Sequence, residues 1–185
     1  MKHTIAALGV AAAFVSPYHA VGGDRPQGEV RHQVESAAAA PATGSQPQAG
    51  FSLPAIKAEL RSAGVTFVDE KVLPSGGVIW ALQLAGLKFG ITAYQVEGNT
   101  AKSLQLNAVF SDGGRVERAQ KMTAANKWNL DSRFVTAAVL DGDHHNDIML
   151  EMDLIAIGAM EPRAVVRTIS DEWMFALMQW ATRAH

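Results

Sequence analysis

Hydrophobic residues recur at helical spacing in three segments of this chain. Leu53, Ile56 and Leu60 fall on one face of a helix. Ser52 is suited to cap the start of this helix, and Gly64 is suited to end it. The predicted helices run from Ser52 to Gly64, from about Arg115 to Trp128, and from about Glu161 to Arg183.

Elsewhere the chain alternates between hydrophobic and polar residues or carries short apolar runs bounded by turn residues. Both patterns are typical of β-strands, and Gly-rich or Asp-rich turns separate the segments. The predicted strands are Val65–Lys71, Val78–Leu84, Leu87–Val96, Leu104–Phe110, Phe134–Leu140 and Ile148–Leu154.

The order of these elements predicts an α+β fold. It reads helix, four strands, helix, two strands, helix (α-β-β-β-β-α-β-β-α), and short turns between strands favour antiparallel pairing. In the last strand Leu150 and Met152 point to one side, while Glu151 and Asp153 point to the other. We therefore expect an antiparallel sheet of about five to six strands, with three helices packed on its apolar face.

The N-terminal segment has a different pattern. Lys2 and His3 precede an unbroken run of small and apolar residues from Ile5 to Val15, which is too short to span a bilayer. The run fits the hydrophobic part of a secretory signal peptide. We predict a signal peptide over residues 1–20 with cleavage after Ala20; an uncleaved tether or a misassigned start codon is the alternative.

Residues 21–50 contain no aromatic residue, leucine or isoleucine and are rich in Gly, Pro, Ala, Ser and Gln. Such a segment buries too little apolar surface to offset the entropy of ordering it. We predict a flexible linker over 21–50 and one folded domain over 51–185.

Composition narrows the function classes. The formal net charge is -2 and no basic cluster is present, which argues against a nucleic-acid-binding surface. The absence of cysteine excludes disulfides, thiolate nucleophiles and Cys-ligated zinc. No later apolar run is long enough to cross a membrane, so no transmembrane helix is expected.

A set of motifs in the second half of the domain resembles the YbjN-type domain family, described as putative bacterial sensory transduction regulators. The motifs are Ala124-Ala125-Asn126-Lys127-Trp128-Asn129, Arg133-Phe134, Leu140-Asp141-Gly142-Asp143 and Leu150-Glu151-Met152-Asp153-Leu154. The resemblance implies a fold similar to type III secretion chaperones and no established catalytic residue. The His144-His145-Asn146 stretch departs from the family's shorter turn.

Read physically, these motif residues are predicted to be structural, with partner contact as the alternative. Trp128 is expected to anchor the end of the second helix, which Asn126 and Asn129 flank. If the hairpin pairs Phe134 with Leu154, Arg133 lies diagonal to Asp153 on the opposite face. Glu151 and Asp153 share that face, and solvated carboxylates explain them better than a glycosidase pair.

Candidate chemistry is sparse. Of six histidines, only His144 and His145 lie inside the predicted domain away from its C-terminal residue. No Gly-x-Ser-x-Gly elbow or phosphate-binding loop accompanies them, so catalysis is not expected. The same turn contains three aspartates, Asp141, Asp143 and Asp147, at the spacing of a calcium-binding loop. The calcium-loop pattern fails, because Asn146 and Met152 occupy the positions that require Gly and Glu. The turn is therefore predicted to be a solvated hairpin connection, with a His/Asp metal site as the alternative.

The last predicted helix is hydrophobic nearly all round. Its core stripe comprises Val165, Val166, Ile169, Trp173, Leu177 and Trp180. Met174, Phe175 and Met178 lie off this stripe, which indicates either further burial or a partner surface.

These patterns together predict an exported, periplasmic or secreted, non-enzymatic module. We expect no cofactor and a protein partner, which can be a second copy of the chain in a homodimer. A metal-responsive module using the Asp141–Asp147 turn is the second hypothesis, and an enzyme with an unfamiliar site is the third.

Overall fold

This computed structural model describes residues 49–141 and 147–183. The described chain folds into eight strands and three helical segments, the last of which contains one π turn. The strands are β1 (Phe51–Ser52), β2 (Thr66–Val72), β3 (Val78–Leu84), β4 (Leu87–Tyr94), β5 (Thr100–Ala101), β6 (Ser103–Phe110), β7 (Thr136–Val139) and β8 (Ile148–Ile155). The helical segments are α1 (Leu53–Ser62), α2 (Arg118–Asp131) and the C-terminal helix, which comprises α3 (Pro162–Thr168), the π turn η1 (Ile169–Trp173) and α4 (Met174–Arg183).

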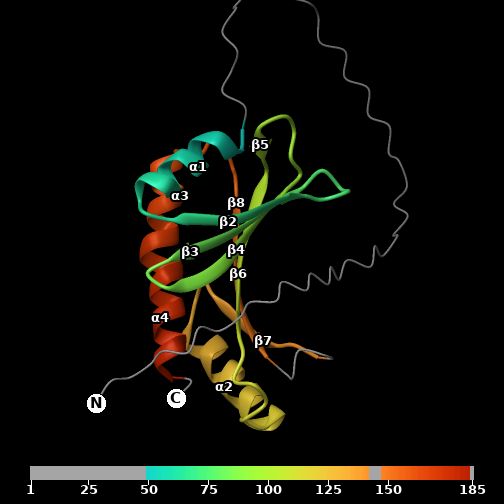
Figure 1. The fold of residues 1–185 in the computed structure, drawn as a ribbon, viewed down its shortest axis with the longest axis vertical. Coiled ribbons are helices and arrows are strands. Elements are labelled where there is room, and N and C mark those ends of the chain that lie inside the picture. Colours follow the sequence, from blue (N-terminus) through green and yellow to red (C-terminus); the bar gives the residue numbers. More distant parts are fainter. Residues whose placement is uncertain (1–48, 142–146, 184–185) are drawn as a thin grey trace, which may run out of the picture. The chain divides into compact units, whose positions relative to one another are not determined.

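The predicted α+β class is confirmed. Six strands form one antiparallel sheet in the order β2-β3-β4-β6-β8-β7, and β1 pairs with β5 in a second, two-stranded sheet (Figure 1). The predicted bounds of β3 agree with the structure, whereas β1 and β5 were not predicted. Two-residue strands leave no periodic signal long enough to recognise.

The alternation of residues along the strands gives the large sheet one apolar face. Leu106 on β6 lies opposite Met152 on β8, and both side chains are buried. Between these positions, Asn107 lies opposite Glu151 on the other face. Because side chains alternate across a strand, this register directs the hydrophobic set of each strand to the same side.

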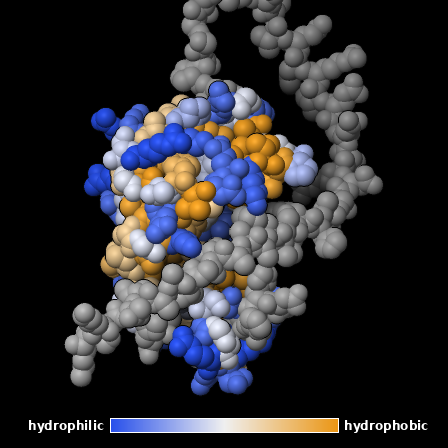
Figure 2. Space-filling model, in the orientation of Figure 1, coloured by the Kyte–Doolittle hydropathy of each residue, from blue (hydrophilic) through white to orange (hydrophobic). Residues whose placement is uncertain are grey.

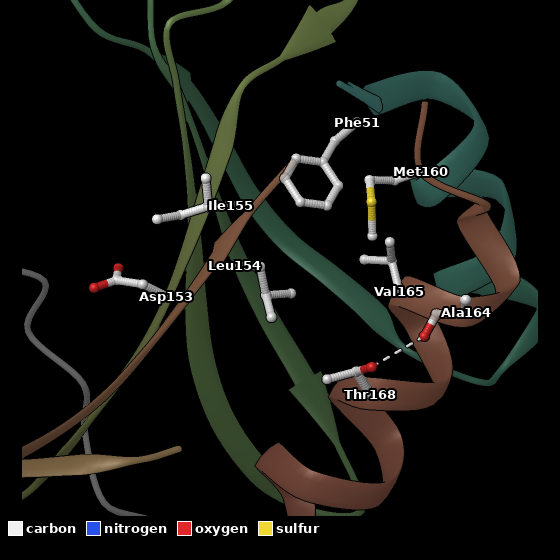
Figure 3. Close-up of a pocket in the computed structure, with 8 residues that line it drawn as sticks. All are labelled: Phe51, Asp153, Leu154, Ile155, Met160, Ala164, Val165 and Thr168. Atoms are coloured by element: carbon white, nitrogen blue, oxygen red, sulfur yellow. Dashed lines mark hydrogen bonds between the residues drawn. The ribbon is translucent and has the colours of Figure 1, made fainter. Parts of the chain in front are cut away.

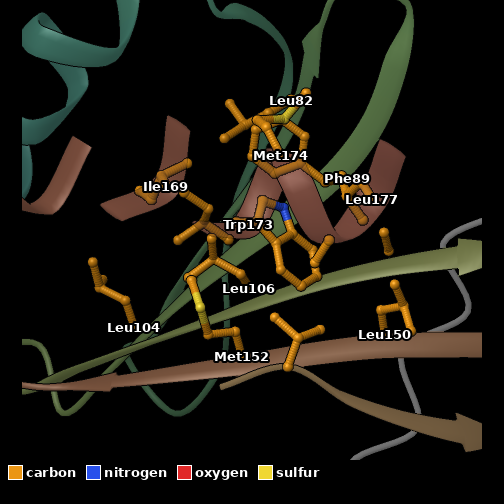
Figure 4. Packing of buried hydrophobic residues seen from close by; sticks show 14 of the residues in the cluster. Leu82, Phe89, Leu104, Leu106, Leu150, Met152, Ile169, Trp173, Met174 and Leu177 are labelled. Atoms are coloured by element: carbon orange, nitrogen blue, oxygen red, sulfur yellow. The ribbon is translucent and has the colours of Figure 1, made fainter. Parts of the chain in front are cut away.

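Helices α1 and the C-terminal helix cover this apolar face (Figure 1). Trp173 is fully buried and lies among Leu106, Phe89 and Leu177 in the centre of the core (Figure 4). The predicted core stripe of the C-terminal helix is buried at every position, which confirms the helical spacing inferred for it.

The π turn of the C-terminal helix inserts one extra residue between its two α-helical parts. A π turn is wider than an α turn and rotates the following side chains relative to the preceding ones. Within this turn the indole N–H of Trp173 is buried without a hydrogen-bond partner among the described residues. Such an unpaired donor is uncommon in a protein core and is destabilising.

Helix α2 begins three residues later than predicted because Asp112 holds the preceding segment in a turn. Its carboxylate accepts the backbone N–H groups of Gly114 at 2.9 Å and Val116 at 2.8 Å. It also pairs at 2.7 Å with Lys121, whose side chain is buried. Burial acts to raise the pKa of Asp112, but the hydrogen bonds from Lys121, Gly114 and Val116 outweigh it and lower the pKa below its ordinary value.

The hairpin of β7 and β8 differs from prediction in its register and its start. Thr136 lies opposite Glu151, and Phe134 precedes the strand instead of pairing with Leu154. The expected diagonal contact between Arg133 and Asp153 is therefore wrong. Within the described residues, no ion pair joins them.

The folded region takes in Gly50, one residue before the predicted domain start. Its N–H donates to the carbonyl of Gly158 at 2.9 Å, and its carbonyl accepts the N–H of Met160 at 3.1 Å. Phe51, next in the chain, is fully buried. The predicted signal peptide and almost all of the predicted linker lie outside the described residues.

Within residues 49–141 and 147–183, no helix combines the length and the hydropathy that crossing a bilayer requires.

Candidate functional site

Hollows open on the surface of the described domain, and two of them lie beside the C-terminal helix. The first, of about 200 Å³, lies between β8 and the start of the C-terminal helix (Figure 3). Phe51, Met160 and Val165 form its apolar wall, and Leu154 points into it from β8. Asp153 points away from these residues, so the hollow lacks converging polar groups. Ligand sites usually combine a larger cavity with such groups, which makes this hollow a poor candidate.

The second hollow is a groove of about 300 Å³ between the C-terminal helix and the segment 131–135, which begins at the last residue of α2. Buried side chains of Trp128, Val135 and Ala176 contribute to its lining. We call it the α2–α4 groove. The remaining lining residues are Asp131, Ser132, Arg133, Phe134, Glu172, Phe175 and Gln179.

Two aromatic rings at this groove are unusually exposed. Phe134 is 66% exposed on the α2–β7 side, and Phe175 is 54% exposed on the C-terminal helix. Met178, three residues after Phe175, is 50% exposed. Figure 2 shows that, on the face in view, hydrophobic residues reach the surface in patches separated by hydrophilic ones. Exposed aromatic side chains lining a concavity are typical of interaction sites.

Met174 does not belong to this surface, so of the two alternatives predicted for it, burial is the one observed. Its side chain is 5% exposed and is part of the hydrophobic core. The π turn immediately precedes Met174, and its extra residue turns the start of α4 relative to an uninterrupted α-helix. Regular helical spacing placed Met174 off the core stripe, whereas the structure packs it into the core.

The α2–β7 side of the groove is fixed by two residues of the sequence motif. The indole N–H of Trp128 donates to the carbonyl of Val135 at 2.8 Å, and its ring packs edge-on against Trp180 with centroids 5.3 Å apart. Asn129 forms two hydrogen bonds with the backbone of Ala137. These contacts hold the segment carrying Arg133 and Phe134 against the C-terminal helix.

Charged groups of both signs lie around the exposed rings. Arg133 lines the groove on the α2–β7 side, Asp131 precedes it, and Glu172 lines the side formed by the C-terminal helix. None of these three side chains takes part in an ion pair with another described residue. Their charges are therefore available to a molecule that enters the groove.

Asn126 differs from Asn129 although both belong to the same motif. Helix α2 continues to Asp131, so both asparagines lie within the helix instead of flanking its end. Both are exposed and lie outside the lining of the groove, but Asn129 is hydrogen-bonded to the backbone of Ala137.

Glu151 and Asp153 lie on the sheet face opposite the core. Glu151 has Asn107 as its neighbour on one side and Thr136 on the other. Burial raises the pKa of Glu151, and the nearby Asp153 carboxylate raises it further. These carboxylates lie outside the α2–α4 groove and do not share its lining.

Most of the predicted metal-ligand turn lies outside the described residues, namely Asp143, His144 and His145. Asp141 is exposed and forms an ion pair with Arg118. Asp147 is buried, and its Oδ1 has no hydrogen-bond partner in the described part of the chain. Among those same residues, no three His, Cys, Asp or Glu side chains are grouped so that they could hold a metal ion.

Several groove residues were not singled out by the sequence. Glu172 lies three residues before Phe175 and Gln179 four residues after it, so all three share one side of the C-terminal helix. Nothing in the sequence connects that side with the segment 131–135. Only the packing of α2 beside the C-terminal helix brings the two segments together.

No protein-family model, curated protein or solved structure matches this chain.

Proposed function

We propose that this chain is an exported, non-enzymatic protein-binding module that contacts its partner through the α2–α4 groove. The observation that carries the proposal is the exposure of Phe134 and Phe175 at one groove whose floor is rigidly packed. Aromatic side chains contribute much of the binding energy at protein interfaces when they are desolvated by a partner.

The chemistry of the described residues supports binding over catalysis. The chain has no cysteine, and apart from its last residue the predicted domain has only two histidines, His144 and His145, both in the predicted turn. Histidine and cysteine are the side chains most often used as general base or nucleophile near neutral pH. The groove offers one guanidinium, two carboxylates and an amide around apolar surface. Such a lining is suited to recognising a protein surface.

The resemblance of the 124–154 motifs to the YbjN-type domain supports a regulatory or chaperone-like binding role. In this proposal Trp128 and Asn129 maintain the groove, while Arg133 and Phe134 contact the partner. The motif residues would thus include some that are structural and some that contact the partner.

The central experiment is photocrosslinking in intact cells with a photoreactive amino acid in place of Phe175. A matched control carries it in place of Val72, which is also exposed but lies on edge strand β2. We expect a protein adduct from position 175 that is absent from position 72. Equal labelling at both positions, or no protein adduct at position 175, would contradict the proposal.

The exported location has a separate test. We expect cell fractionation to recover the protein outside the cytoplasm and N-terminal sequencing to begin at Val21, because cleavage is predicted after Ala20. Recovery from the cytoplasm with Met1 retained would overturn this part of the proposal.

A metal-responsive function is the second candidate. It is favoured by Asp147, the last residue of the predicted His/Asp turn, whose buried Oδ1 has no hydrogen-bond partner among the described residues. Calorimetric titration of the full chain with zinc and copper tests it. Saturable heat that disappears in a His144→Ala, His145→Ala double variant would support the site, and no heat at micromolar metal would exclude it.

A further inference from the structure

The α2–α4 groove has the features expected of a surface that binds a second copy of itself. We propose that two chains associate about a two-fold axis through this groove, with Arg133 of each chain facing Glu172 of the other. The inference rests on the proposed protein-binding function and names the partner as a second copy of this chain.

The charges at the groove suit a two-fold interface. In a two-fold interface the same patch occurs on both partners, so the patch must be complementary to itself. Arg133 and Glu172 meet this requirement because they carry opposite charges on the two sides of one groove. Neither is neutralised by another described residue, so association would provide each with its counterion.

The exposed aromatic rings of the groove also suit contact with a second copy. Phe134 and Phe175 of one chain would meet the same residues of the other, which removes four exposed rings from water in the pair. Two chains each carrying a formal charge of only -2 also repel each other weakly. A partner whose surface carries charges of only one sign could pair with Arg133 or with Glu172, but not with both. The other residue would face a like charge or no charge.

The edge strands of the large sheet, by contrast, each have a residue whose backbone is engaged by a side chain. On β7 the Asn129 side chain occupies the backbone groups of Ala137, and on β2 the Asp69 carboxylate accepts the N–H of Glu70 at 2.8 Å. Edge strands protected in this way are poorly suited to pair with another chain. The groove is therefore a better dimer surface than either edge.

The test is the molar mass of the full-length chain by sedimentation equilibrium across a micromolar concentration range. We expect a monomer–dimer equilibrium and at least a tenfold weaker association for Phe175→Ser, because this ring lies at the contact. The exposed-residue control Val72→Ser should associate like the unaltered chain. A chain that stays monomeric throughout the range, or an unaltered affinity in Phe175→Ser, would overturn the inference.

A charge exchange tests the proposed pairing itself. Arg133→Glu and Glu172→Arg should each weaken self-association, because like charges then face each other across the axis. Mixing the two variants should restore association, since both contacts of the mixed pair again join opposite charges. Failure of the mixture to associate would contradict the pairing between chains.

The two proposals fail in different ways. A monomeric chain that crosslinks from position 175 to a different protein would overturn self-association and retain the protein-binding function. Absence of a protein adduct at position 175, together with a monomer in solution, would contradict both.

Discussion

Asn129 pairs with the backbone of Ala137 much as a neighbouring β-strand would. Its side-chain nitrogen donates to the Ala137 carbonyl at 2.9 Å, and its side-chain oxygen accepts the Ala137 N–H at 2.7 Å. Strand β7 is the last strand of the sheet, and this amide satisfies the groups that face away from β8. A residue of α2 thus fixes the edge of the sheet and, with it, one side of the α2–α4 groove.

Replacing Asn129 with Ala should therefore loosen β7 while leaving the rest of the core in place. Loss of two hydrogen bonds to partly buried backbone groups is expected to lower the free energy of unfolding by about 1–3 kcal/mol. Hydrogen exchange at the Ala137 amide measures the local effect and should become faster than in the unaltered chain. Asn126→Ala is the matched control, because Asn126 is exposed on the same helix. Equal exchange in both variants would argue against the role assigned to Asn129.

Trp128 supports the groove through both its ring and its N–H. Trp128→Ala removes a side chain that is 3% exposed and should lower the free energy of unfolding by about 3–5 kcal/mol. Trp128→Phe retains an aromatic ring but removes the hydrogen bond to the Val135 carbonyl, so a smaller loss is expected. Chemical denaturation of both variants measures these changes. An unchanged midpoint for Trp128→Ala would show that the residue does not anchor α2.

The sequence was sufficient to predict the body of the fold because its helices and longer strands carry repeated hydrophobic spacing. Leu53, Ile56 and Leu60 were assigned to one buried helix face, and all three are buried. The strands β1 and β5 were missed because their pairing depends on contacts between distant segments. The start of α2 was misplaced because the Asp112 carboxylate accepts the backbone N–H groups of Gly114 and Val116. This local turn delays the helix, and the hydrophobic pattern does not record it.

The groove was only partly predictable. Phe175 and Met178 were recognised from their position off the core stripe, but Phe134 was assigned to a strand. Its exposure follows from the later start of β7, which no local pattern reveals. Met174 was placed off the core stripe because regular periodicity does not account for a π turn, which changes the direction of the side chains that follow it.

Glu151 should make stability depend on pH. Its pKa is raised in the folded domain above the ordinary value of 4.5, so the folded state binds its proton more tightly than the unfolded state. The contribution of Glu151 to the free energy of unfolding is therefore largest at pH values below 4.5. It is lost as the pH rises from 4.5 through the raised pKa of the folded domain. Glu151→Gln should be more stable than the unaltered chain at neutral pH, and the difference should vanish in acid.

Denaturation of both proteins across this pH range measures the effect. Asp153→Asn is a useful second variant because the Asp153 carboxylate contributes to the raised pKa of Glu151. Asp153→Asn should lower the pKa of Glu151, so the loss of stability should occur at lower pH than in the unaltered chain. A Glu151→Gln variant that is less stable than the unaltered chain at neutral pH would contradict this account.

Gly50 connects the N-terminal segment to the fold at a position that only glycine suits. Its φ angle is +142°, and a Cβ atom there would lie 2.6 Å from the backbone oxygen of Ala101 and 2.4 Å from the Thr100 side chain. Gly50→Ala should therefore lower the free energy of unfolding by about 3 kcal/mol or more, because backbone strain and a steric clash act together.

Gly76→Ala is the matched control: Gly76 also has a positive φ, of +82°, but open space surrounds its Cβ position. The control should cost only about 1–2 kcal/mol, as expected for an alanine in left-handed backbone. Equilibrium denaturation of both variants separates the two contributions, and equal losses would show that the contact of Gly50 with the 100–101 strand is not part of the cooperative fold.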